Sequence, residues 1–120
     1  MKSNFAEGSI DQVLFQQQAL FIGNFALNAQ TNLLKFAHEK PRQITPRECD
    51  VLKLLCQNVD KVVTRKRILK TYWNDTSGYA SRSLDLIIHR LRKHLILDPK
   101  VKIYTIRSKG FILTANSLPE

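Results

Sequence analysis

The chain has 120 residues, of which 43% are hydrophobic, and a formal net charge of +9. This length suffices for one domain with a modest core, and the hydrophobic content excludes wholesale disorder. No apolar run approaches the roughly 18 residues of a membrane-spanning helix, and the N-terminal sequence lacks the apolar segment of a secretory signal. We therefore expect a cytoplasmic protein without a membrane partner.

The positive charge is concentrated in one part of the chain. Residues 64–110 contain twelve basic and three acidic residues, whereas residues 1–63 contain seven basic and six acidic ones. Surface charge is ordinarily of both signs, so this asymmetry predicts an anionic partner. Nucleic acid is favoured over a membrane surface because the cations alternate with core-forming positions and do not line one long amphipathic helix.

The cysteines and histidines do not predict a disulfide or a metal site. Cys49 and Cys56 fall in one predicted helix, where seven residues at roughly 1.5 Å per residue separate their Cα atoms by about 10 Å, too far for a disulfide. The three histidines form no ligand cluster. We expect two buried, structural cysteines and no cofactor.

The first part of the chain predicts a tail and then a small sheet. Residues 1–19 show no clear pattern and are predicted to be a linker or flexible tail. Four short apolar or mixed runs follow, separated by turn-forming residues, which is typical of an antiparallel sheet. The expected strands are Leu20–Gly23, Phe25–Asn28, Asn32–Phe36 and Arg42–Ile44.

Three helices are predicted next. The first begins at Thr45, where Glu48 completes a capping box, and stops near Asn58. The second is capped by Thr64 and extends to about Tyr72; its basic first turn, with Arg65 and Lys66, opposes the helix dipole and would be stabilised by a phosphate. A loop spans residues 74–80, and the third helix spans about 81–97 with a buried stripe of Leu84, Ile88, Leu91 and Leu95.

The C-terminal part predicts a β-hairpin. Its strands are Val101–Ile106 and Phe111–Thr114, and its turn contains Arg107, Lys109 and Gly110, of which Gly110 is expected to adopt a positive φ. Residues 115–120 are assigned to a C-terminal tail.

This order of elements resembles a winged helix-turn-helix, and specific residues resemble the C-terminal DNA-binding (output) domain of OmpR/PhoB-family response regulators. The resemblance covers about residues 20–114. It rests on Ile44-Thr-Pro-Arg-Glu48, Val63-Thr-Arg-Lys-Arg67 with Ile68-Leu69, Trp73, Arg82-Ser-Leu-Asp85, Ile88-His-Arg-Leu-Arg-Lys93, and Thr105-Ile-Arg107 with Gly110-Phe111. It implies an α+β fold with an N-terminal four-stranded antiparallel sheet, three helices and a C-terminal hairpin wing.

The resemblance also implies where the chain would meet DNA. The family places its third helix in the major groove and its wing at the adjacent minor groove. The candidate contacts are Arg65, Lys66, Trp73, Arg82, Ser83, Leu86, His89, Arg90, Lys93, Thr105, Arg107 and Lys109. Arg90 is the best candidate for a base contact and Lys93 for a phosphate contact. A core position explains Trp73 as well as a DNA contact does. For Arg92, burial of the stem against the first helix and a DNA contact are equally well supported.

The function that follows is sequence-specific binding of double-stranded promoter DNA in a two-component system. If the natural chain is longer, the resemblance implies a receiver domain upstream; if it is not, the chain would be an isolated output domain. The resemblance also implies a contact to RNA polymerase through loop 74–80, with Tyr79 as anchor, and a monomer that forms a tandem dimer on DNA. The alternative is a winged-helix module that docks a protein, because fold alone does not decide function. An enzyme is disfavoured because no nucleophile–base set, carboxylate pair or phosphate loop is present.

Overall fold

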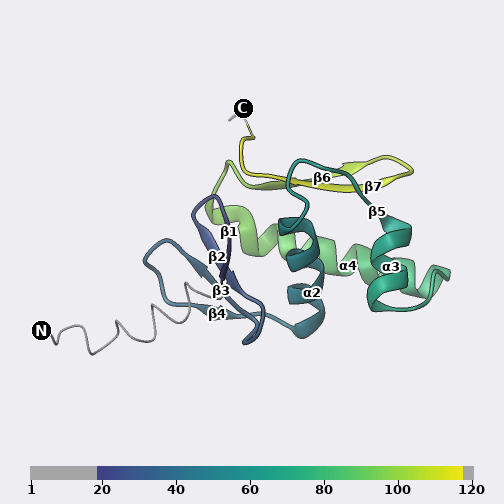
Figure 1. Cartoon of the computed structure of the whole chain (residues 1–120), viewed down its shortest axis with the longest axis horizontal. Helices are drawn as coiled ribbons and strands as arrows, with labels where there is room; N and C mark the ends of the chain where they lie inside the picture. The colour runs from purple at the N-terminus through teal and green to yellow at the C-terminus, as the bar shows by residue number, and fades with distance from the viewer. Residues whose placement is uncertain (1–18, 118–120) are drawn as a thin grey trace, which may run out of the picture.

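The computed structural model describes residues 19–117, which form two small sheets around a group of three helices (Figure 1). The N-terminal sheet contains β1 (Ala19–Ile22), β2 (Phe25–Asn28), β3 (Leu33–Phe36) and β4 (Arg42–Gln43), paired antiparallel in chain order. The predicted four-stranded sheet is confirmed. Of the predicted linker, residues 1–18 lie outside the described residues, and Ala19 begins β1.

The three helices are α2 (Pro46–Cys56), α3 (Arg65–Tyr72) and α4 (Gly78–His94), and a 3-10 turn, η1 (Leu95–Leu97), extends the last one. The predicted caps of the first two are confirmed. The N–H of Glu48 donates to Thr45 Oγ1 (3.2 Å), and the N–H of Thr45 donates to Glu48 Oε1 (3.0 Å). The N–H of Arg67 donates to Thr64 Oγ1 (3.1 Å). Satisfied N–H groups at these ends explain why both helices begin where the sequence predicts.

The third helix begins three residues earlier than predicted. Ser77 caps it by accepting from the N–H of Ala80, and Asp75 fixes Ser77 by accepting from both its N–H and its hydroxyl at 2.9 Å. Burial of Ala80 draws this turn against the core. The predicted loop 74–80 is therefore wrong in its second half: the connection spans 74–77, and Tyr79 lies in the first turn of α4.

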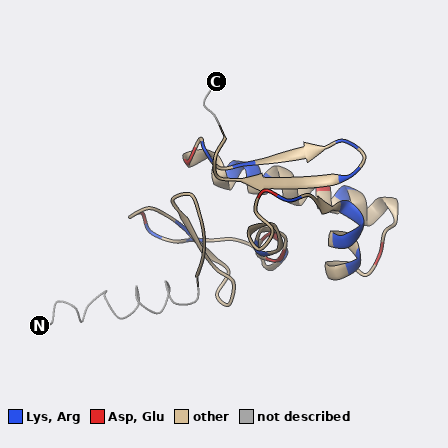
Figure 2. Cartoon of the chain, turned by 45° about the horizontal axis from the view of Figure 1, so that its top comes forward, with Lys and Arg blue, Asp and Glu red and all other residues tan. Residues whose placement is uncertain are grey.

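The C-terminal sheet has one strand more than the predicted hairpin. Strands β6 (Lys102–Ile106) and β7 (Gly110–Thr114) form the hairpin, which we call the wing, and β5 (Val63–Thr64) pairs with β7 on the other side. In both views the wing extends along α4 (Figures 1 and 2). The sheet therefore connects the start of α3 to the wing.

The turn of the wing differs from the prediction. Ser108, and not Gly110, has the positive φ (63°). Gly110 is required for another reason, since a Cβ at this position would lie 2.1 Å from the carbonyl oxygen of Val63 in the paired strand.

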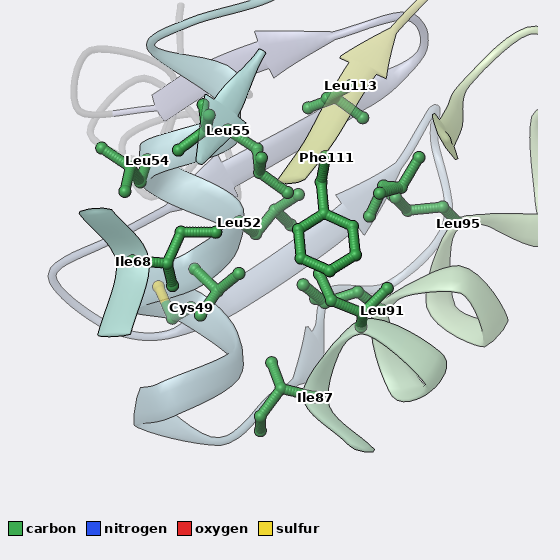
Figure 3. Packing of buried hydrophobic residues seen from close by; sticks show 14 of the residues in the cluster. Cys49, Leu52, Leu54, Leu55, Ile68, Ile87, Leu91, Leu95, Phe111 and Leu113 are labelled. Atoms are coloured by element: carbon green, nitrogen blue, oxygen red, sulfur yellow. The ribbon is translucent and has the colours of Figure 1, made fainter. Parts of the chain in front are cut away.

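One hydrophobic core connects both sheets and all three helices. Leu52 and Leu55 of α2, Ile68 of α3, and Leu91 of α4 are 0% exposed. Figure 3 shows the side chain of Phe111, from β7, pointing into this cluster among leucines of α2 and α4. The core thus fixes the wing and α4 against the same central helix.

Three other predictions about burial need correction. Cys49 is fully buried, whereas Cys56 is mostly buried and packs against the edge of the core, and both thiols are free. Ile87 joins the buried stripe of α4. Ser117, in the predicted tail, is buried, and its hydroxyl lies 2.6 Å from the Tyr104 hydroxyl. No helix between residues 19 and 117 is long and apolar enough to cross a bilayer.

Candidate nucleic-acid interface

Helix α4 has one buried face and one exposed cationic face. Ala80, Leu84, Ile87, Ile88 and Leu91 are buried. The exposed residues Tyr79, Arg82, Leu86, Arg90 and Lys93 follow one another at spacings of three and four, which places them on one side of the helix. His89 belongs to the same exposed side, whereas Ser83 is half-buried at its border.

Sequence reasoning did not place Tyr79 on this face. Its side chain is 75% exposed, and it precedes Arg82 by one turn. The signal that could have found it is the Asp75 and Ser77 pair, which is typical of a helix N-terminus. With Leu86, which is 47% exposed, it gives the cationic face two large apolar groups.

Positive charge gathers on α3, on α4 and at the wing turn (Figure 2). Neither α3 nor α4 has an acidic residue in its first turn. An open cleft of about 700 Å³ lies between these parts. It is lined by Val62, Thr64, Arg65, Lys66, Leu69, Thr76, Ser81, Ser108 and Lys109. The lining combines the cations and hydroxyls with the apolar side chains of Val62 and Leu69.

Arg65 directs its donors into the protein and does not extend freely toward a ligand. Its Nη1 donates to Ser81 Oγ (2.8 Å), and its Nη2 donates to Asp85 Oδ1 (2.6 Å). Its guanidinium carbon lies 5.3 Å from the centroid of the Phe111 ring. Arg65 therefore has a structural role that its predicted phosphate contact did not include.

Arg92 makes a contact that neither of the two alternatives included, and its DNA contact stays a prediction. The residue is exposed, and its guanidinium reaches β6 of the wing. Nε and Nη2 donate to the carbonyl oxygen of Ile103 (3.0 and 2.8 Å), and Nη2 donates to Thr105 Oγ1 (2.8 Å). Sequence spacing gives no signal for this contact.

The remaining predicted site residues lie at the edges of the same region. Lys66 on α3 and Thr105, Arg107 and Lys109 on the wing are exposed. Trp73 ends α3 and is half-buried, with the guanidinium carbon of Arg47 4.7 Å from its ring centroid. Between residues 19 and 117, no three His, Cys, Asp or Glu side chains come together as metal ligands.

Comparison with protein families agrees with this architecture. Residues 39–113 match the family described as "Transcriptional regulatory protein, C terminal". The transcriptional regulatory protein RprY of Bacteroides fragilis is 36% identical over 92 residues, which cover 77% of this chain and 39% of the relative. Transcriptional regulatory protein YxdJ of Bacillus subtilis is 32% identical over 85 residues, covering 70% of this chain and 37% of the relative. The chain thus spans about two fifths of the length of these relatives.

Solved structures give the same result. The response regulator DrrB of Thermotoga maritima, an OmpR/PhoB homolog, superposes with a TM-score of 0.67 at 28% identity, over 88% of this chain and 49% of that one. The DNA-binding domain of RstA from Klebsiella pneumoniae, solved in complex with the RstA box, gives a TM-score of 0.69 over 82% of this chain and 99% of that one. The second likeness, at 24% identity, shows the fold. The predicted winged helix-turn-helix fold is confirmed.

Proposed function

Since the chain belongs to the family of transcriptional regulatory proteins, as their C-terminal domain, we propose that residues 19–117 bind double-stranded DNA sequence-specifically as the output domain of a two-component response regulator. The proposal places α4 in the major groove and the wing at the adjacent minor groove. A domain that binds chromosomal DNA must reach it, so the proposal includes a cytoplasmic location.

The cationic face of α4 is the observation that carries this proposal. Its polar side chains are exposed, and the opposite face is fixed in the core, so the helix presents a rigid edge. The major groove is about 12 Å wide and admits one helix, whose side chains then reach the base edges. A solvated surface would not need cations on α4, on α3 and on the wing together.

Individual side chains on α4 suit different contacts. Arg90 has a planar guanidinium that can donate twice to O6 and N7 of guanine, the commonest specific contact. Lys93, one turn further along, is a point charge that suits a phosphate. Arg82 and Ser83, near the start of α4, can donate to the backbone, and the exposed apolar surface of Leu86 suits a thymine methyl group. His89 offers fewer donors than arginine, so we assign it weaker readout of guanine.

The cleft beside α4 supports a path for the phosphate backbone. Lys66 and Lys109 line it from α3 and from the wing turn. Trp73 can donate its indole N–H to a phosphate from its half-buried position, and Thr105 and Arg107 reach the minor groove from the wing. Arg65 contributes charge there, while its hydrogen bonds hold α4 in place.

The partners beyond DNA are part of the proposal. An upstream receiver domain is supported by the relatives, which are longer than this chain. We propose that the domain is a monomer alone, that two copies bind tandem half-sites, and that the 74–77 connection contacts RNA polymerase. We do not include Tyr79 in this contact, because its side chain lies on the exposed cationic face of α4, which we propose turns toward DNA.

Titration of fluorescently labelled duplexes, followed by anisotropy at several salt concentrations, tests the proposal. We expect affinity to fall steeply with salt, since each neutralised phosphate releases counterions, and to retain a preference for particular sequences. Arg90→Ala should cost about 1–3 kcal/mol on preferred duplexes and reduce that preference. Lys40→Ala is the control, because it removes the same charge from an exposed turn of the N-terminal sheet. A domain that binds no duplex at low salt would favour the alternative, a protein-docking module.

A further inference from the structure

Arg92 connects α4 directly to the wing. Its three hydrogen bonds, of 2.8 to 3.0 Å, join the C-terminal half of the helix to Ile103 and Thr105 of β6. The two donors on Nη2 and the one on Nε form a rigid planar fork, so the contact fixes direction as well as distance. The wing cannot move along or away from α4 without breaking these bonds.

A second connection lies two helical turns earlier on the same side of α4. Asp85 precedes Arg92 by seven residues, which places both on one face. Asp85 accepts from Arg65, whose guanidinium also lies over the ring of Phe111 in β7. The helix is thus tied to both strands of the wing, directly at Arg92 and through Arg65 at Asp85.

We infer that Arg92 is a positioning residue that holds the wing at a fixed distance and orientation relative to α4. The domain therefore recognises a major-groove site and a minor-groove site that are separated by one particular number of base pairs. This inference rests on the proposed function. It adds that the spacing between the two elements is itself recognised, independently of any contact to the base pairs between them.

The contact also orients Thr105. Its Oγ1 accepts a hydrogen bond from Arg92 Nη2, so its own O–H is left to donate to another acceptor, such as a phosphate oxygen. Arg92 therefore aligns one proposed DNA contact on the wing in addition to placing the wing.

The charge of Arg92 must be separated from its geometry in any test. Both acceptors are neutral, a carbonyl and a hydroxyl, so the guanidinium keeps its full attraction for a polyanion. Arg92→Lys retains the charge and loses the fork, and is therefore the informative substitution. Lys100→Arg, in the exposed turn before β6, is the control for exchanging one cation for the other.

The experiment begins with duplexes selected from a random pool by the unaltered chain and footprinted to locate the helix and wing contacts. One base pair is then inserted between the two contacts. We expect the unaltered chain and Lys100→Arg to lose about tenfold in affinity, equivalent to ~1.4 kcal/mol, and Arg92→Lys to lose about threefold or less. Thr105→Val removes one of the two acceptors and should give an intermediate loss.

The alternative outcomes are distinct. If the chain selects no duplex, the proposed function fails. If it selects a duplex and tolerates the inserted base pair, or if Arg92→Lys loses as much as the unaltered chain while its thermal unfolding is unchanged, the positioning role is overturned. Should Arg92→Lys fail to fold, Thr105→Val still decides, because an unchanged spacing penalty in that variant contradicts the inference.

Discussion

Arg65 and Asp85 join α3 to α4 through a contact of 2.6 Å between Nη2 and Oδ1. The same guanidinium donates to Ser81, one turn earlier on α4, and lies over the Phe111 ring. One side chain therefore connects the starts of two helices and the wing sheet, which explains why a cation at the beginning of α3 is tolerated despite the helix dipole.

The Arg65–Asp85 pair should contribute little to stability by itself. The two side chains are 34% and 60% exposed, so a double-mutant cycle with Arg65→Ala and Asp85→Asn should give a coupling free energy below about 1 kcal/mol. Chemical denaturation measures this. A coupling free energy of several kcal/mol would contradict the expectation that solvent screens this exposed ion pair.

Lys93→Ala should weaken binding to all duplexes about equally. A phosphate contact carries no sequence information, and its loss should reduce the slope of log affinity against log salt by about 0.9. Anisotropy titrations on a selected and an unrelated duplex provide both values. A loss confined to the selected duplex would assign Lys93 to a base instead.

Gly110→Ala should destabilise the domain by about 1–3 kcal/mol, because its Cβ would lie 2.1 Å from the Val63 carbonyl oxygen and 2.7 Å from Thr64 Cα. Gly78→Ala is the matched control. Its Cβ would meet only Arg82 Nη1 at 3.5 Å, so this change should be neutral or stabilise by roughly 0.4–1 kcal/mol. Thermal unfolding distinguishes the two, and equal effects would contradict the strand pairing of Gly110.

Truncation of one leucine of α4 should reduce stability, whereas truncation of another should reduce DNA binding. Leu91 is 0% exposed, so Leu91→Ala should cost about 2–5 kcal/mol of unfolding free energy. Leu86 is 47% exposed, so Leu86→Ala should change stability by no more than about 0.5 kcal/mol and weaken DNA binding. Denaturation and anisotropy on both variants check the assignment of the two faces of α4.

The thiol of Cys56 should be unreactive in the folded domain. Burial, and to a smaller extent the nearby Cys49, raises the pKa of Cys56 from 9.0 to about 12. The thiol therefore stays protonated where the unfolded chain ionises, and its contribution to stability is complete below pH 9 and is lost as the pH rises toward 12. Alkylation should require denaturant at about pH 8. The free energy of unfolding of Cys56→Ala should fall less between pH 9 and pH 12 than that of the unaltered domain. Rapid alkylation of Cys56 in the native domain would contradict the raised pKa.

The local signals in the sequence predicted most of the architecture. The capping box at Thr45 and the cap at Thr64 set the starts of two helices, and apolar periodicity gave the buried face of α4. Strand β5 was missed because two residues, Val63 and Thr64, show no periodicity, and their pairing partners lie in β7, far along the chain. The early start of α4 was missed because Asp75 and Ser77 are as typical of a loop as of a helix cap.

Some features of the candidate site could likewise be predicted from local sequence, and others could not. The sequence by itself determined the exposed face of α4 from Arg82 to Lys93, and it placed the excess positive charge in residues 64–110. Periodicity and composition are local properties, so both could be read along the chain. Only the tertiary structure decided that Arg65 and Arg92, similar cations in the same basic region, hold the wing to α4 through Asp85, Ile103 and Thr105. The physical reason is that a guanidinium has five donors and a long stem, so its partners depend on which segments packing brings within reach, and no spacing along the chain encodes that distance.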